Sequence, residues 1–194
     1  RSERAAHRVR TSVTAVVEQR LKLKVNRDKS RVVPARAATL LGFGFYFARG
    51  GKVGIRIDPK AVKRLKGQLR ELTSRRWSIA MPERVEKINR FTAGWMGYFR
   101  LADGSHLFRE LDKWLHRRMR QIRWKEWKLP KTRRAMLRKL GINERFSREW
   151  GNSSKGYWRI AGSGVLQRAL PNAYWDDLGL HMLKPTWQRL RSAG

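Results

Sequence analysis

The chain has 194 residues, a length that suits one domain or two small ones. Hydrophobic residues make up 41% of the sequence, which is enough for a core, so the high charge does not imply disorder. Lys and Arg number 46 against 15 acidic residues, and a formal net charge of +31 predicts a polyanionic partner, usually nucleic acid.

Several classes of site and location are disfavoured by what the sequence lacks. There are no cysteines, which excludes disulfides, Cys-based zinc sites and thiol catalysis, and the four histidines are too widely separated to predict a metal site. No run approaches the ~20 apolar residues of a membrane span. The start, "RSERAAHRVR", lacks the apolar core of a signal peptide and reads as a piece cut from a longer chain. We expect a cytoplasmic protein without a membrane partner.

The first 57 residues predict a small α+β fragment. Residues 3–19 carry apolar residues at helical spacing, with Ser2 as a possible N-cap. "LKLKV", residues 21–25, alternates strictly and predicts a half-buried strand. Two further strand patterns, "TLLGFGFYF" and "KVGIRI", flank Gly50-Gly51 and predict a β-hairpin. We expect the helix to pack on a small antiparallel sheet that cannot bury both of its faces alone.

Residues 58–194 predict a mostly helical domain. Asp58-Pro59 is a strong helix start, a second helix opens at Pro82, and a third runs from about Ser105 to Lys128. A fourth helix begins at Pro130 and is expected to end at Gly141. Shorter elements follow, after a Gly/Ser-rich stretch at 151–164. The predicted fold class is therefore α+β, a β-containing fragment followed by an α-helical domain.

The stretch 113–139 is the strongest candidate for nucleic-acid binding, because it holds twelve Lys/Arg and one acid. Five residues step by 4, 3, 4 and 4 and share one helical face, predicted to lie opposite the apolar stripe: Lys113, Arg117, Arg120, Trp124 and Lys128. The full candidate set is Lys113, Arg117, Arg118, Arg120, Arg123, Trp124, Lys125, Lys128, Arg133 and Arg134. Whether the rings of Trp124 and Trp127 stack on bases or pack between helices stays open.

Several segments together resemble group II intron reverse transcriptases, the intron-encoded maturases. "LKLKVNRDKSRVV" and "LLGFGF" resemble the last palm segments of that family. "INRFTAGWMGYFRL", "LDKWLHRRMRQIRWKEWK" and "RRAMLRKLGI" resemble its thumb, or maturase domain, and the tail from "SKGYWRIAGSG" is similar to the usual C-terminus. The resemblance implies the end of a palm at residues 1–57 and a thumb at 58–194. It also places Lys29 near the nucleotide phosphates and Leu41, Gly42 and Phe43 in the primer grip.

The quartet "YWDD", residues 174–177, has the letters of the catalytic motif of reverse transcriptases. In the resembled family that motif lies on a palm β-hairpin, upstream of the segment that begins here. This quartet instead follows Pro171-Asn172 and precedes Leu178-Gly179, a context that predicts a short helix closing at glycine. Adjacent helical carboxylates point about 100° apart and share a metal ion poorly. We therefore expect Asp176 and Asp177 not to be catalytic.

Three functions remain open. The chain is the RNA-binding C-terminal portion of a maturase, or part of an active RNA-directed DNA polymerase whose catalytic half is supplied by upstream residues or another chain, or a basic structural protein of a ribonucleoprotein. The palm-like strands argue against the third. The resemblance implies group II intron RNA, or an RNA template with a DNA primer, as partner, and allows a DNA target. The chain alone is predicted inactive and without cofactor, with Mg²⁺ expected only beside the missing catalytic half.

Overall fold

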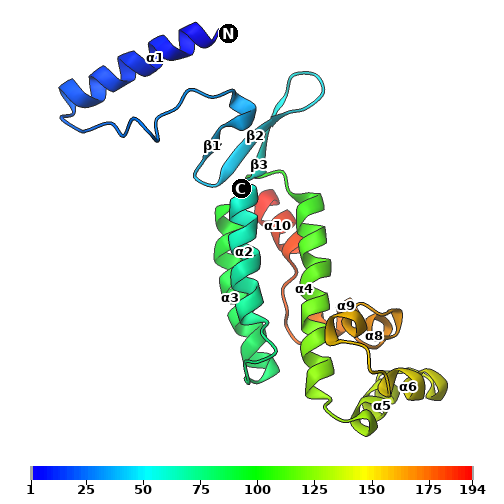
Figure 1. Ribbon diagram of the computed structural model, residues 1–194. Helices are drawn as coiled ribbons and strands as arrows, with labels where there is room; N and C mark the ends of the chain where they lie inside the picture. Colours follow the sequence, from blue (N-terminus) through cyan, green and yellow to red (C-terminus); the bar gives the residue numbers. More distant parts are fainter. Residues whose placement is uncertain (1, 194) are drawn as a thin grey trace. The chain divides into compact units, whose positions relative to one another are not determined.

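The computed structural model describes residues 2–193, and contacts divide the chain into one unit that ends at Arg56 and another that starts at Ile57 (Figure 1). The predicted α+β class is confirmed, since helices dominate and one three-stranded sheet is present, in the order β1-β2-β3. Among the described residues, no helix combines the length and apolar character needed to cross a membrane.

The first unit contains helix α1 (Glu3–Ala15), which continues as a π-helical turn at Val16–Arg20. The side chain of Ser2 accepts a hydrogen bond from the amide of Ala5, so the predicted N-cap is confirmed. A 3₁₀ turn (Ala35–Ala37) precedes β1 (Thr39–Leu40), β2 (Phe43–Phe47) and β3 (Val53–Ile57). Strands β1 and β2 are antiparallel, and Gly50 and Gly51 turn the chain between β2 and β3 with φ of +82° and +75°. The predicted hairpin is confirmed.

Two expectations for this unit were wrong. The segment "LKLKV" forms no strand, and Leu21 and Leu23 are both exposed. A strand needs a neighbour to satisfy its backbone groups, and no strand of the sheet pairs with this segment. Helix α1 does not pack on the sheet either, because it buries no residue and Val9 and Val13 are exposed. Instead its N-terminal half lies beside residues 32–35, with a groove between them.

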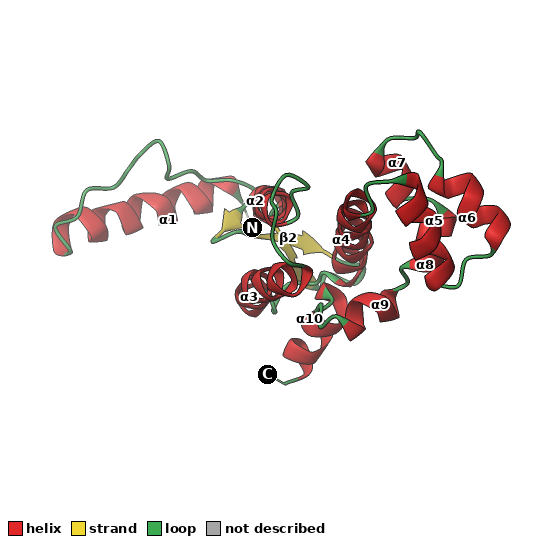
Figure 2. Ribbon diagram, turned by 90° about the horizontal axis from the view of Figure 1, so that it is seen from below, coloured by secondary structure: helices red, strands yellow, loops and turns green. Residues whose placement is uncertain are grey.

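The second unit is organised around α2 (Pro59–Leu72), α3 (Met81–Tyr98), α4 (Ser105–Glu126) and α10 (Leu183–Ser192), which run side by side (Figures 1 and 2). The carboxylate of Asp58 accepts a hydrogen bond from the amide of Lys60 at 2.6 Å, which confirms the predicted start of α2. The predicted apolar stripe of α4 is buried throughout: Phe108, Leu111, Leu115, Met119 and Ile122.

The remaining helices group beside α4, on the side away from α2 and α3 (Figure 2). They are α5 (Pro130–Lys139), α6 (Glu144–Gly151), α7 (Tyr157–Ala161), α8 (Gly164–Ala169) and α9 (Asn172–Asp177). Helix α5 packs on α6, and α7 packs on α4. Gly141 takes φ of +79° directly after α5, as the sequence predicted for the end of this helix.

The C-terminal helix is fastened to α4 by a buried carboxylate. The two oxygens of Asp112 accept hydrogen bonds from the amides of Leu183 and Lys184 at 2.8 and 2.9 Å, which satisfies two donors at the start of α10. Burial raises the pKa of Asp112 to about 6, although both amide contacts oppose the shift. The indole of Trp187 on α10 also donates to the carbonyl of Ala102. These contacts close the core of the second unit.

Candidate nucleic-acid interface

The helical face predicted for RNA is turned inward at its centre. Arg120 is only 8% exposed, and its Nε donates to the carbonyl of Ala161 in α7 at 2.9 Å. Two guanidinium nitrogens of Arg117 donate to the carbonyl of Trp158, and this guanidinium lies 4.2 Å from the Trp158 ring centroid. The expectation that these arginines face solvent was therefore wrong for Arg120. Helix α7 covers this side of α4, so both arginines join two helices.

The open alternatives for Trp124 and Trp127 are settled in favour of packing. Trp124 is 2% exposed, and the two rings lie 5.9 Å apart in an edge-to-face arrangement. Arg133 lies over the Trp124 ring and donates through Nε to the carbonyl of Trp127. A base cannot stack on a ring that is already enclosed, so the candidate role of Trp124 in base stacking is withdrawn.

A different face of α4 carries two further cations, the half-buried Arg118 and the exposed Lys125. Trp114, Arg118, Gln121 and Lys125 step by 4, 3 and 4 along this face, which borders the C-terminal end of α2. Around the half-buried ring of Trp114 lie three cations, which we call, with the ring, the Trp114 cluster: Lys66 at 5.8 Å, Arg70 at 5.6 Å and Arg118 at 5.5 Å from its centroid. Ring and cations attract each other through the ring's negative face.

Arg118 is held in place by the end of α2. Its Nε donates to Thr73 Oγ1, and its Nη2 donates to the carbonyls of Arg70 and Thr73, both at 3.1 Å. Burial lowers the pKa of Arg118, and the neighbouring charges of Arg70 and Arg75 lower it further. The Nζ of Lys125 donates to the carbonyl of Arg75. Positive charge therefore accumulates where α2 and α4 meet, and no carboxylate within residues 2–193 is among the groups that shift the pKa of Arg118.

Carboxylates neutralise cations elsewhere in the unit. On α3, Lys87 pairs with Glu83 and Arg90 with Glu86. Two of the predicted RNA-binding residues are also paired. Lys113 lies 2.8 Å from Glu110. Arg123 lies 2.7 Å from Glu126, and its guanidinium is over the Tyr174 ring. In the described part of the chain, the Trp114 cluster has no such pairing, so no carboxylate neutralises its charge.

The other candidates lie at scattered places. On the second unit, Lys128 is exposed after α4, and Arg134 is half-buried on α5, with its side chain against Gly151. In the first unit, Lys29 lies in an exposed turn in which its amide donates to Asn26 Oδ1. Roles for these residues in binding stay predictions.

Leu41 and Gly42 form the two-residue turn between β1 and β2, and Phe43 begins β2. Both turn residues have positive φ, +51° and +83°, the pattern of a type I′ hairpin turn. This backbone conformation is unusual for leucine, and the Leu41 side chain is 74% exposed. The resemblance places the primer grip at this turn, and that role stays a prediction.

The "YWDD" quartet lies on α9, and Gly179 follows with φ of +80°, so the predicted short helix closing at glycine is confirmed. Trp175 is fully buried, and its ring stacks on that of His116 at 6.4 Å between centroids. Asp176 and Asp177 are exposed. No cluster of three or more His, Cys, Asp or Glu suited to a metal ion occurs within residues 2–193. The quartet thus contributes a core tryptophan to the fold.

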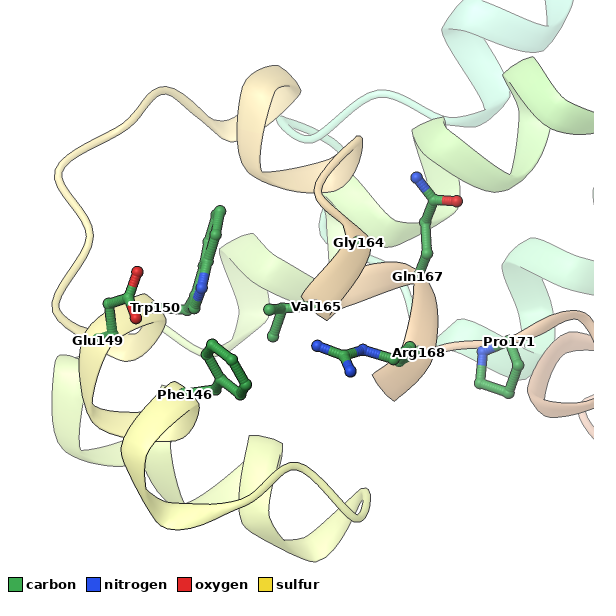
Figure 3. Close-up of a pocket in the computed structure, with 8 residues that line it drawn as sticks. All are labelled: Phe146, Glu149, Trp150, Gly164, Val165, Gln167, Arg168 and Pro171. Carbon is green, nitrogen blue, oxygen red and sulfur yellow. The ribbon is translucent and has the colours of Figure 1, made fainter.

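A second meeting of cations and rings occurs between α6 and α8, where sequence reasoning proposed no site (Figure 3). Phe146 and Trp150 from α6 line a shallow pocket together with Arg168 from α8. The guanidinium of Arg168 lies 5.5 Å from the Phe146 centroid, and the Nζ of Lys155 lies 4.8 Å from that of Trp150. Glu149 also lines this pocket, so its charge is more nearly balanced than that of the Trp114 cluster.

Residues 62–141 match the family described as the group II intron, maturase-specific domain. The matched segment runs from α2 to the end of α5 and includes the whole Trp114 cluster. The resemblance read from the sequence is confirmed over this segment. No curated protein matches the chain. The match supports a group II intron maturase role, in splicing, and it implies interaction with group II intron RNA.

Proposed function

We propose that this chain is the RNA-binding C-terminal portion of a group II intron-encoded reverse transcriptase/maturase. Its second unit grips intron RNA, or a duplex of RNA template and DNA primer, through the surface where α2 meets α4. One observation carries the proposal: the three cations of the Trp114 cluster lie inside the matched maturase segment, and none of them pairs with a carboxylate of the described residues.

The physical basis is the displacement of counterions from phosphates. Each cation that neutralises a phosphate releases a condensed counterion, which makes binding favourable and dependent on salt. The ring of Trp114 holds Lys66 and Arg70 beside Arg118, so less side-chain freedom is lost when a backbone arrives. The charges on α3 are already paired with glutamates and gain less from a phosphate.

Reverse transcription belongs to the proposal only in part. Polymerisation requires carboxylates that hold Mg²⁺ ions, and we propose that residues or a chain beyond this sequence supply them. The turn formed by Leu41 and Gly42 would then hold the primer end, while the second unit holds the duplex or the folded intron. The chain by itself is expected to bind RNA without extending a primer.

The experiment is a titration of a group II intron RNA with the full chain at several salt concentrations. Replacing Lys66 and Arg70 by alanine removes two phosphate contacts, so the slope of log affinity against log salt should fall by about 1.5. The matched control replaces Lys87 and Arg90 on α3, where glutamates already neutralise the charge, and should leave the slope unaltered. Equal slopes for both double variants would contradict the proposed surface.

A further inference from the structure

A pocket opens next to the Trp114 cluster, between the loop that joins α2 to α3 and the middle of α4. Five residues line it, and we call it the arginine pocket: Ser74, Arg75, Arg76, Arg118 and Gln121. It lies at the C-terminal end of α2, where exposed carbonyls would ordinarily repel an anion. The identity of its lining nevertheless points to an anionic ligand.

The carbonyls at this end of α2 are already occupied. Arg118 binds those of Arg70 and Thr73. Arg84 donates to the carbonyls of Leu72 and Ser74 at 2.6 and 3.3 Å. Their partial negative charge is therefore countered before any ligand arrives.

The three arginines of the pocket have no carboxylate partner in the described part of the chain. Arg75 lies over the ring of Tyr157 at 4.6 Å, which leaves its charge uncompensated, and the side chain of Arg76 is exposed. Arg118 is fixed by hydrogen bonds from two of its three guanidinium nitrogens. Three like charges beside one cavity repel each other, and an anion between them would remove that repulsion.

Gln121 offers the pocket a neutral hydrogen-bond donor. The residue is 8% exposed and lines the pocket, and its side chain makes no hydrogen bond within the described part of the chain. Its amide is not among the fully buried groups that lack a partner, so it faces the open space of the pocket. The amide nitrogen has two protons to donate. An oxygen-rich ligand in the pocket would satisfy it.

We propose that the arginine pocket binds one phosphate group, with the guanidinium groups of Arg75, Arg76 and Arg118 neutralising it and the amide of Gln121 donating to one of its oxygens. Guanidinium groups suit this task because their planar donors match phosphate oxygens. The source of the phosphate is the RNA backbone, a step that rests on the proposed function. The pocket then fixes one nucleotide in register, while the Trp114 cluster binds its neighbours by charge alone.

The first test uses inorganic phosphate with the full chain and follows thermal unfolding. Phosphate should raise the Tm more than sodium chloride at equal ionic strength, because a ligand of the folded state stabilises it. The extra rise in Tm should vanish in Arg76→Ala and in Gln121→Leu, which remove no hydrogen bond between side chains of the described residues. It should persist in Arg189→Ala, which removes an exposed arginine from α10. If phosphate raised the Tm beyond the effect of sodium chloride equally in the native chain and in all three variants, the proposed phosphate site would be wrong.

The second test uses group II intron RNA and identifies the source of the phosphate. Arg76→Ala should lower the salt slope by about 0.7 to 0.9, whereas Gln121→Leu should weaken binding about tenfold with the slope unchanged. Arg189→Ala should alter neither. If RNA binds all variants alike while the phosphate excess still depends on Arg76, the pocket takes free phosphate and its assignment to RNA is wrong. If no variant nor the native chain binds RNA, the proposed function fails and the phosphate test alone decides the pocket.

Discussion

Asp112 and His116 lie one turn apart on α4 and are both buried, but their pKa values move in opposite directions. Burial raises the pKa of Asp112 from 3.8 to about 6, because the charged carboxylate is the disfavoured form. Burial lowers the pKa of His116 from 6.5 to about 4, and the charge of Arg120 adds to the effect. One residue is thus a carboxyl group that resists ionisation, and the other an imidazole that resists protonation.

The two shifts should nearly cancel in the pH dependence of stability. The contribution of Asp112 is present below about pH 4 and is lost as the pH rises to about 6. That of His116 is present above pH 6.5 and is lost as the pH falls to about 4. His116→Phe should therefore make the chain less stable at pH 7 than at pH 4.5, and Asp112→Asn should do the reverse, each by about 2 kcal/mol. Urea unfolding at both pH values measures the free energy of unfolding of each variant. A change with pH of the same sign in both variants would contradict the prediction.

At the scale of helices, some arginines of α4 join it to neighbouring helices through hydrogen bonds. Arg120 joins α4 to α7 through the carbonyl of Ala161, and burial lowers its pKa to about 10, with Arg117 adding to the shift. Arg120→Ala should destabilise the fold by roughly 1.5–3 kcal/mol, the range for a hydrogen bond made by a charged group. The salt slope of RNA binding, measured per folded molecule, should stay the same. A lower slope with unaltered urea unfolding would return Arg120 to the RNA-binding surface.

The helices were predictable where a cap and an apolar stripe coincide. Asp58-Pro59 starts α2, and the stripe from Phe108 to Ile122 is buried in α4 as expected. Contacts between helices that lie far apart in the sequence were not predictable. Helix α7 has only five residues and lies within a Gly/Ser-rich stretch, so its sequence is too short to show a repeating helical pattern. It nevertheless covers Arg120. The alternation of "LKLKV" predicted a strand that the structure does not contain. An alternating sequence does not by itself provide the neighbouring strand with which its backbone would form hydrogen bonds.

The structure buries Arg120 and Trp124 at the centre of the face of α4 that the sequence favoured, and the surface we propose lies on another face of the same helix. Lys113, Arg117 and Arg120 share one face of α4, whereas Trp114, Arg118 and Lys125 share another, and both carry enough charge to attract RNA. Spacing within one helix cannot choose between them. The choice is made by α7 on one side and by the end of α2 on the other. The sequence feature that points to the proposed surface is Trp114, an aromatic residue at helical spacing from Arg118 and Lys125.

At the scale of the whole molecule, the two units differ in how much they bury. Among residues 2–56, the side chains are exposed or half-buried, and Gly44 is the one buried position. The unit from Ile57 encloses a continuous core that includes Leu65, Ile88 and Leu115. Apolar burial is the main favourable term in folding, so the second unit should hold nearly all of the stability that can be attributed to a core.

Residues 57–194 should therefore fold alone, whereas residues 1–56 should not. All nine tryptophans lie beyond Ile57, so their fluorescence reports on the second unit without interference. The isolated second unit should unfold in one cooperative transition by fluorescence and by circular dichroism. Isolated residues 1–56 should lose ellipticity gradually on heating, since a hairpin with one exposed helix is at best marginally stable in water. A cooperative transition in that fragment would mean that its strands and helix bury a core of their own, and a broad transition for residues 57–194 would mean that the maturase segment depends on the first unit to fold.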